Sequence, residues 1–398
     1  ALTSALVRLL VTRRFGRDSG AAGPGAGATA GRPPRAALGQ NDAMTSPNAL
    51  TALPGLRDLA LPLVQAPMAG YQGATLALAV AGQGALGSVP AATLTPEALA
   101  TELERMAASG RPYNVNFFCH VPPTPEAARE AAWREALTPF YAEAGIDPAG
   151  IPAGAGRRPF DEAMAEVLER FRPPVVSFHF GLPAPQLLAR VKAWGATVWS
   201  SATTVDEARW LVQHGADAVV AQGLEAGGHR GHFLDDDLTR QLGTLALVPQ
   251  LVAAVKVPVI AAGGIADAAG VRAAMALGAS GVQVGTAFLC CPEASTSALH
   301  RTALMSDAAH HTELTTLFSG RPARGIVNRL MRTLGPLNTA APAFPLATAA
   351  VAPLRAHFEA QGRTDCTPLW SGQNASGCRA VPATEIVAEL AQGFSAAR

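Results

Sequence analysis

The sequence has no run of roughly 18 or more apolar residues, so we expect no membrane-spanning helix. It also lacks an excess of charge of one sign, because 31 basic and 30 acidic side chains leave a formal net charge of +1. Such a chain has no general attraction for nucleic acid or an anionic membrane, and we expect neither as a partner. Charged residues make up 15% of the chain and hydrophobic residues 49%, which excludes a disordered composition and permits a large core.

Cysteine is scarce, and its spacing excludes the common uses of paired thiols. There are five cysteines, an odd number, and no two have the C-x-x-C spacing of a zinc or redox site. We therefore predict reduced thiols in a cytoplasmic protein. They are Cys119, Cys290, Cys291, Cys366 and Cys378.

Residues 1–43 differ from the rest of the chain. They combine six arginines with two aspartates in an apolar stretch that turns into a segment rich in Gly, Ala and Pro. Two interpretations fit: a targeting-like peptide, or a disordered extension upstream of Met44, which resembles a natural start. In both cases we expect the folded domain within residues 44–398.

From residue 60 onward, short apolar runs alternate with Ala-rich stretches of helical pattern, as in parallel strands joined by crossover helices. The runs predict eight strands, at 61–66, 85–89, 113–118, 175–180, 197–201, 218–222, 259–262 and 281–286. Helices are expected near 73–81, 95–109, 160–171, 184–194, 204–214, 244–255 and 267–277.

Eight parallel units close into a barrel more naturally than they spread into an open sheet, so the predicted fold is an α/β, (β/α)8 TIM barrel. An open doubly wound sheet is the alternative, but it would place its phosphate site at the first strand, whereas the glycine signals here come last. Three segments depart from the repeat. We expect a helical excursion at 119–158, a lid or subdomain at 290–375 and a closing helix at 380–396, with its amphipathic part at 383–394.

Glycines mark the ends of the last two predicted strands. Gly263 and Gly264 lead into a helix that begins near Asp267, and Gly285-Thr286 closes strand eight. Glycine lets backbone N–H groups approach an oxyanion, and a helix N-terminus adds a favourable field. Tight turns alone would also explain these glycines, but many barrels hold a phosphate at this position, which favours a phosphate site.

The sixth predicted strand runs into QGLEAGGHRGHF at 222–233, where the glycines indicate backbone packed against a flat or charged ligand. Gln222 offers a donor and an acceptor to a ring edge, and His229, Arg230 and His232 offer positive charge. A flexible surface loop is the alternative. A metal site is disfavoured, because no paired carboxylate or cysteine accompanies the two histidines.

Two other strands carry side chains suited to a flat ring. Pro67 and Met68 follow the first strand as a rigid turn with a polarisable tip, or as a buried structural turn. Asn114 and Asn116 of the third strand face the same way, because side chains alternate along a strand. The edge of a heterocycle would satisfy the hydrogen bonds of both amides.

His179 stands at the tip of the fourth predicted strand. A lone histidine on an apolar strand is usually structural, but the carboxyl end of a barrel strand favours a catalytic role. Its neutral form accepts a proton near pH 7, and its charged form holds an anion. Late in the chain, LWSGQ at 369–373 either closes over a ligand or docks the terminal helix.

These segments together resemble one family. QAPMAG, the VNFF strand, FHFG, QGLEAGGHRG, PVIAAGGIAD and GVQVGTAFL occur in the order seen in nitronate monooxygenases, formerly called 2-nitropropane dioxygenases, and FHFG and LWSGQ resemble class I. The resemblance implies an FMN-binding barrel without a metal. It also implies oxidation of alkyl nitronates, such as propionate 3-nitronate, by O2 to carbonyl compounds and nitrite or nitrate.

The same resemblance implies roles for individual residues. The active-site histidine would be His179. Flavin contacts would fall on Ala66, Pro67, Met68, Asn116, Gln222, Gly227 and Gln373, and phosphate contacts on Gly264, Gln283, Val284, Gly285 and Thr286. The chain departs from the family in residues 1–43 and in the Pro-rich stretch 121–158, which lies near the site.

The expected chemistry agrees with these residue types. A nitronate is an anion, so His179 with His229 or Arg230 is expected to bind it electrostatically. A neutral nitroalkane would need a base to remove its α-proton, and His179 is the candidate. We expect a monomer or a homodimer.

Three other functions fit parts of the pattern. An FMN-dependent enoyl-acyl-carrier-protein reductase shares the glycine turn and a similar histidine-bearing strand, but it needs a reduced nicotinamide as donor. A flavin-free isomerase or lyase would bind a phosphorylated metabolite at the same glycines. A non-catalytic flavin-binding protein would be yellow but would consume no O2 with any nitronate.

Overall fold

The computed structural model describes residues 50–151 and 157–395. Residues 41–398 are the second of the two units into which the chain divides. The extension predicted at 1–43 lies outside the described residues, so the fold is that of the second unit. None of the helices in the described ranges is long and apolar enough to cross a bilayer.

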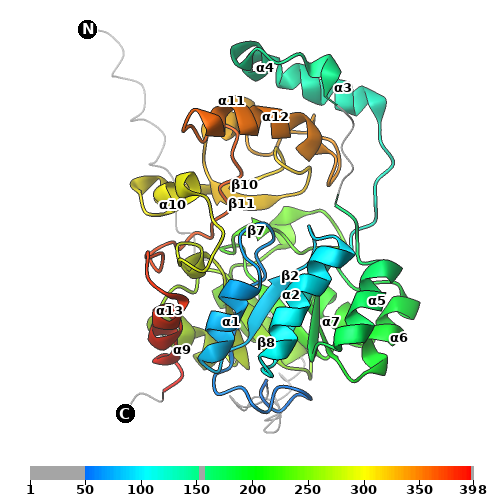
Figure 1. The fold of residues 1–398 in the computed structure, drawn as a ribbon, viewed down its shortest axis with the longest axis vertical. Coiled ribbons are helices and arrows are strands. Elements are labelled where there is room, and N and C mark those ends of the chain that lie inside the picture. Colours follow the sequence, from blue (N-terminus) through cyan, green and yellow to red (C-terminus); the bar gives the residue numbers. More distant parts are fainter. Residues whose placement is uncertain (1–49, 152–156, 396–398) are drawn as a thin grey trace, which may run out of the picture. The chain divides into compact units, whose positions relative to one another are not determined.

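Eight parallel strands at the centre of this unit form a barrel (Figure 1). Their order is β1-β9-β8-β6-β5-β4-β3-β2, and a parallel bridge between Val64 and Leu86 joins the two ends. This closure confirms the barrel and makes the open-sheet alternative wrong. The strands are β1 (Leu63–Gln65), β2 (Gly87–Pro90), β3 (Tyr113–Phe118), β4 (Val175–His179), β5 (Thr197–Ala202), β6 (Ala218–Gln222), β8 (Val259–Ala262) and β9 (Gly281–Val284).

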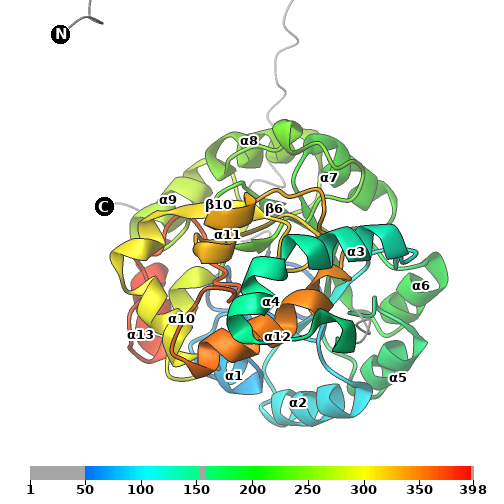
Figure 2. The same cartoon turned by 90° about the horizontal axis from the view of Figure 1, so that it is seen from above.

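Helices surround the strands as an outer ring (Figure 2). They are α1 (Ala74–Gly82), α2 (Pro96–Ala108), α5 (Glu162–Phe171), α6 (Pro185–Ala193), α7 (Val205–Gln213), α8 (Thr244–Ala254), α9 (Ala268–Ala276) and α13 (Ala383–Ala391). The first seven confirm the predicted helices. The last, α13, comes from the amphipathic stretch 383–394 and packs against α1 and α9.

Side-chain caps start several ring helices soon after the preceding strand ends. Thr95 accepts a hydrogen bond from the Ala98 N–H at the start of α2, and Thr204 accepts one from the Glu207 N–H at the start of α7. Each such cap stabilises a helix by about 1 kcal/mol. Short connections of this kind leave the carboxyl ends of the strands at one mouth of the barrel.

Two segments far apart in the sequence form a second layer above that mouth (Figures 1 and 2). The first supplies α3 (Ala127–Ala136) and α4 (Thr138–Ala144). The second supplies β10 (Thr312–Thr315), β11 (Ala323–Ile326), α11 (Arg329–Leu334) and α12 (Ala347–Ala360), and it follows α10 (Ala298–Leu304) in the chain. We call residues 127–144 and 312–366 the cap subdomain.

The two parts of the cap subdomain share one apolar cluster. Trp133 of α3 is buried, and its Nε1 donates to the Ala347 carbonyl at 3.2 Å. Tyr141 of α4 donates to the Ala350 carbonyl at 2.7 Å. From the sequence, 119–158 and 290–375 were predicted as two separate departures from the strand–helix repeat. In the structure, helices of the two segments pack against each other.

The cap subdomain is tied to the barrel by a short strand, β7 (Gly228–His229), in the loop after β6. β7 pairs antiparallel with β11, which in turn pairs with β10. The loop that leaves the sixth barrel strand is therefore part of the sheet of the cap subdomain.

We predict that Trp133→Ala loosens α3 and α12 together. Replacing a buried tryptophan by alanine lowers the free energy of unfolding by about 3–5 kcal/mol. Here the contacts that are lost are those between the two segments of the cap subdomain. Hydrogen exchange should accelerate in both 127–144 and 347–360, with less change in the barrel strands. Glu135→Ala, at an exposed site on the same helix, is the control. Unchanged exchange in α12 would contradict the prediction.

Candidate active site

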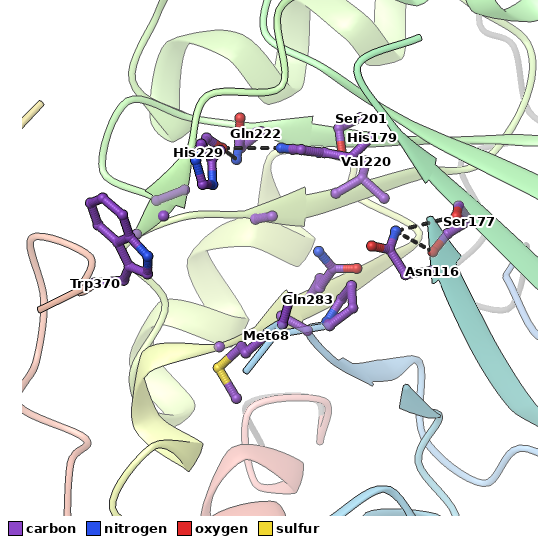
Figure 3. A pocket seen from close by; sticks show the side chains of 18 of the residues that line it. Met68, Asn116, Ser177, His179, Ser201, Val220, Gln222, His229, Gln283 and Trp370 are labelled. Atoms are coloured by element: carbon purple, nitrogen blue, oxygen red, sulfur yellow. Dashed lines mark hydrogen bonds between the residues drawn. The ribbon is translucent and has the colours of Figure 1, made fainter. Parts of the chain in front are cut away.

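A pocket opens at the carboxyl ends of the barrel strands (Figure 3). Figure 3 shows Met68, Asn116 and Gln283 along one side and His179, Gln222 and His229 along the other, with Trp370 at one end. Ten of the residues predicted from the sequence line it: Ala66, Pro67, Met68, Asn116, His179, Gln222, Gly227, Gln283, Gly285 and Thr286.

Glycine backbone forms part of the pocket wall. A Cβ atom at Gly227 would lie 2.6 Å from the Gly372 nitrogen, so no side chain fits there. Gly228 has φ +70°, and a Cβ atom there would meet nothing within 4 Å. Since Gly228 also lines the pocket, a side chain at this position would occupy open space that a flat ring system can use.

The ends of β8 and β9 offer donors for an oxyanion. Within the described chain, the backbone N–H groups of Gly264 and Gly285 donate no hydrogen bond to another backbone group. Thr286 follows Gly285 in the chain and lines the pocket with it, and its Oγ1 accepts a hydrogen bond from the Gly372 N–H at 3.0 Å. Unpaired glycine N–H groups next to a hydroxyl suit a phosphate group. This end of the site therefore fits a phosphate group, such as that of a flavin nucleotide.

The two asparagines of β3 differ in depth. Asn116 lines the pocket and donates from Nδ2 to Ser177 Oγ at 2.9 Å, so its Oδ1 is free to accept from a ligand. Asn114 is completely buried, donates to Ser88 Oγ at 3.0 Å and does not line the pocket. The expectation that both amides meet a heterocycle is therefore wrong for Asn114, because two residues of strand place it about 7 Å further from the mouth.

Gln222 uses both ends of its amide inside the protein. Its Nε2 donates to the His229 carbonyl at 2.9 Å, and its Oε1 accepts from the Gly231 N–H at 2.7 Å. The side chain thus holds the loop after β6 in place, in addition to any contact with a ring edge.

The hydrogen bonds of His179 define its tautomer. Nε2 lies 3.1 Å from the carbonyl oxygen of His229, which only accepts, so Nε2 must carry a hydrogen. Nδ1 lies 2.9 Å from Ser201 Oγ. In the neutral ring, the Nδ1 lone pair therefore accepts the hydroxyl hydrogen of Ser201, which also lines the pocket.

His179 is neutral at physiological pH. Burial is the main reason that its pKa falls from 6.5 to about 3; the hydrogen bond to the His229 carbonyl acts in the opposite direction, and the nearby charge of Arg321 adds to the lowering. Burial, followed by the charge of Arg157, also holds the pKa of His229 well below its usual range. The charged form of His179 is therefore not the group that holds an anion near pH 7.

Arg230 does not reach the pocket, so the expectation that it binds the substrate is wrong. Its side chain is completely buried. It donates to the carbonyls of Gly223 at 2.6 Å and Gln222 at 2.8 Å, and to Gln241 Oε1 at 2.8 Å. His232 is also outside the lining, whereas His229 belongs to it and lies 2.8 Å from Ser319 Oγ.

Three predicted contact residues lie outside the pocket lining. The Gly264 carbonyl accepts from Asn374 Nδ2 at 3.0 Å, and the Val284 carbonyl accepts from the Ala66 N–H at 2.8 Å. Gln373 is exposed, and its N–H donates to the Glu225 carbonyl at 2.9 Å. The cofactor contacts expected of Gly264, Val284 and Gln373 remain predictions.

Several lining residues were not predicted from the sequence: Tyr71, Phe118, Arg157, Ser177 and Ser201. Ser201 lies in β5 near its carboxyl end, and Ser177 pairs in register with Asn116, so a search for polar residues near strand ends would have found both. Arg157 belongs to no helix or strand, and no periodic signal points to it. Trp370, from LWSGQ, also lines the pocket, and its ring lies 5.5 Å from that of His229.

Known proteins are similar to this chain over most of its folded unit. The family model described as nitronate monooxygenase matches residues 51–393. A nitronate monooxygenase of Pseudomonas aeruginosa is 42% identical over 337 residues, which cover 83% of this chain and 95% of that protein. One of Paraburkholderia phytofirmans is 40% identical over 350 residues, covering 87% and 96%.

A solved structure of a nitroalkane oxidase from Streptomyces ansochromogenes is also similar. It has a TM-score of 0.76 and 38% identity, and the match covers 87% of this chain and 98% of that one. Family model, sequence relatives and solved structure all extend over most of the folded unit. This chain therefore belongs to the nitronate monooxygenase family, whose members depend on a flavin.

Proposed function

We propose that this protein binds FMN and oxidises alkyl nitronates, such as propionate 3-nitronate, with O2 to carbonyl compounds and nitrite or nitrate. The observation that carries the proposal is one pocket with glycine backbone at Gly227, Gly228 and Gly285 and an imidazole at His179. A Cβ atom at Gly228 would meet nothing within 4 Å, which leaves room for a flat cofactor, and the imidazole lines the same pocket.

Residues of this chain would hold FMN along one side of the pocket. Gly264, Gly285 and Thr286 would bind its phosphate, while Met68 and Asn116 would contact its ring system. Bound there, FMN supplies the electron transfer, and the protein supplies position and field.

The pocket suits an anionic substrate. No aspartate or glutamate is among the lining residues that the structure describes, and Arg157 contributes a positive charge. The Ser201 hydroxyl at the His179 wall can donate to a nitronate oxygen after it turns away from Nδ1. A nitronate has already lost its α-proton, so its oxidation needs no base.

A neutral nitroalkane, the substrate class named for the Streptomyces protein, must also lose its α-proton. Its α-proton must pass to the Nδ1 lone pair of His179, either directly or through Ser201 Oγ, which already lies 2.9 Å from that nitrogen. Because burial lowers the pKa of His179 to about 3, this base is weak, and we expect nitronates to be the better substrates.

The proposal predicts a yellow protein that consumes O2 with propionate 3-nitronate and with ethylnitronate. An absorbance spectrum followed by oxygen-electrode assays tests it. Anaerobic mixing with NADH distinguishes a nitronate-oxidising enzyme from a reductase, because rapid bleaching of the flavin would favour a nicotinamide-dependent enzyme. Colourless protein would favour the flavin-free isomerase or lyase, and yellow protein without O2 uptake would favour a flavin-binding protein without this activity.

His179→Asn should keep the flavin and lose activity selectively. If His179 is the base, turnover of nitroethane falls by about 10²–10⁴-fold, whereas turnover of preformed ethylnitronate falls much less. Steady-state O2 uptake with both substrates measures the difference, and the flavin spectrum reports cofactor content. Wild-type rates with nitroethane would remove His179 from proton transfer, and equal losses on both substrates would indicate binding instead.

The pKa of His179 also predicts the pH profile. Because its pKa is lowered to about 3, the ring stays neutral as pH falls from about 8 to 5, so kcat/KM for ethylnitronate should show no decline from His179 in that range. Rapid assays with preformed nitronate avoid its slow protonation. An acidic decline near pH 6.5 that disappears in His179→Asn would contradict the lowered pKa.

A further inference from the structure

Arg157 lines the pocket and belongs to the Pro-rich stretch 121–158. Its carbonyl oxygen accepts a hydrogen bond from His120 Nε2 at 3.0 Å, which fixes the backbone beside the pocket. Its guanidinium lies 5.8 Å from the centre of the Phe344 ring. The side chain is therefore held between barrel and cap subdomain by packing.

Among the described residues, the guanidinium of Arg157 has no hydrogen-bond acceptor. Its Nη1 is buried without a hydrogen-bond partner, and no carboxylate of the described residues forms an ion pair with it. The next residue differs, since Arg158 lies 3.7 Å from Asp161 and its side chain is 67% exposed. A buried, unpaired cation is unfavourable, and an anionic ligand would relieve that cost.

Arg157 and His179 occupy different parts of the pocket. The Arg157 guanidinium lies against Phe344 of the cap subdomain, whereas the His179 ring lies against Ser201 of β5 in the barrel, with Nδ1 2.9 Å from Ser201 Oγ. A substrate that puts its nitronate group beside His179 therefore leaves its other end free to approach Arg157.

We propose that Arg157 binds a carboxylate at the end of the substrate remote from the nitronate group, and so makes the enzyme prefer carboxylated nitronates to uncharged alkyl nitronates. The planar fork of a guanidinium matches a carboxylate with two parallel hydrogen bonds. This inference rests on the proposed function, and it assigns substrate selectivity to a residue outside the motifs of the family.

Arg157→Gln tests the assignment with two substrates of equal size. Propionate 3-nitronate carries the carboxylate, and 3-methylbutyl-1-nitronate has an uncharged isopropyl group in its place. We expect kcat/KM for the first to fall at least about 10-fold, mainly through KM, and that for the second to change less than about 3-fold. Arg158→Gln removes the same charge outside the pocket and should leave the ratio of the two unchanged.

Equal losses on both substrates would overturn the proposal, because the guanidinium would then act on the nitronate group or on the fold. Unchanged kinetics with propionate 3-nitronate would overturn it as well. Arg157→Lys keeps the positive charge but lacks the planar guanidinium, so its selectivity should lie between that of Arg157→Gln and that of the unmodified enzyme.

A binding measurement on the unmodified enzyme needs no variant. Succinate has the shape and both charges of propionate 3-nitronate but cannot be oxidised in the same way, and 4-methylpentanoate lacks the second charge. Succinate should bind at least about 10-fold more tightly in calorimetric titrations of the flavin-loaded protein, and the difference should vanish in Arg157→Gln. Equal binding of both acids to the unmodified enzyme would overturn the proposal.

The proposed function and the role of Arg157 are tested by different outcomes. If the unmodified enzyme oxidises neither nitronate, the proposed function is wrong. If it oxidises both with equal kcat/KM, the proposed function stands and the role of Arg157 is wrong.

Discussion

The carbonyl oxygen of His229 is the point on which the geometry of the site depends. It accepts hydrogen bonds from Gln222 Nε2 at 2.9 Å and from His179 Nε2 at 3.1 Å, and so fixes the orientation of both side chains. The same residue pairs with Ala323 of β11, which connects the barrel to the cap subdomain. One peptide group therefore sets the tautomer of the imidazole and the position of the layer above it.

The electrostatics of the site come from arginines rather than from histidines. Burial holds the pKa values of His179 and His229 below the physiological range, so both rings are neutral. Arg321 lies 4.3 Å from the centre of the Phe180 ring and donates to the carbonyls of Arg230 and His232. The positive field around the pocket is therefore permanent, and pH changes near neutrality do not switch it.

The sequence allowed the barrel and most of the pocket to be predicted, because strand ends follow from hydrophobic periodicity and the barrel brings those ends together. His179, Met68 and Gly285 were found in this way. The error at Arg230 has a different origin: the charge is visible in the sequence, but the loop carbonyls that take up its donors are not. Arg157 was missed because its place depends on packing between segments without a repeating pattern.

The shared apolar cluster of the cap subdomain has a consequence for synthesis of the chain. Trp133 and Ala347, joined by a hydrogen bond in the folded protein, are 214 residues apart. On the ribosome, α3 and α4 emerge long before α12 exists, so Trp133, Phe140 and Tyr141 have no native partners from that helix during most of translation. The cap subdomain is thus assembled after the barrel strands have emerged, and a truncated chain would leave these aromatic side chains open to chaperones and to aggregation.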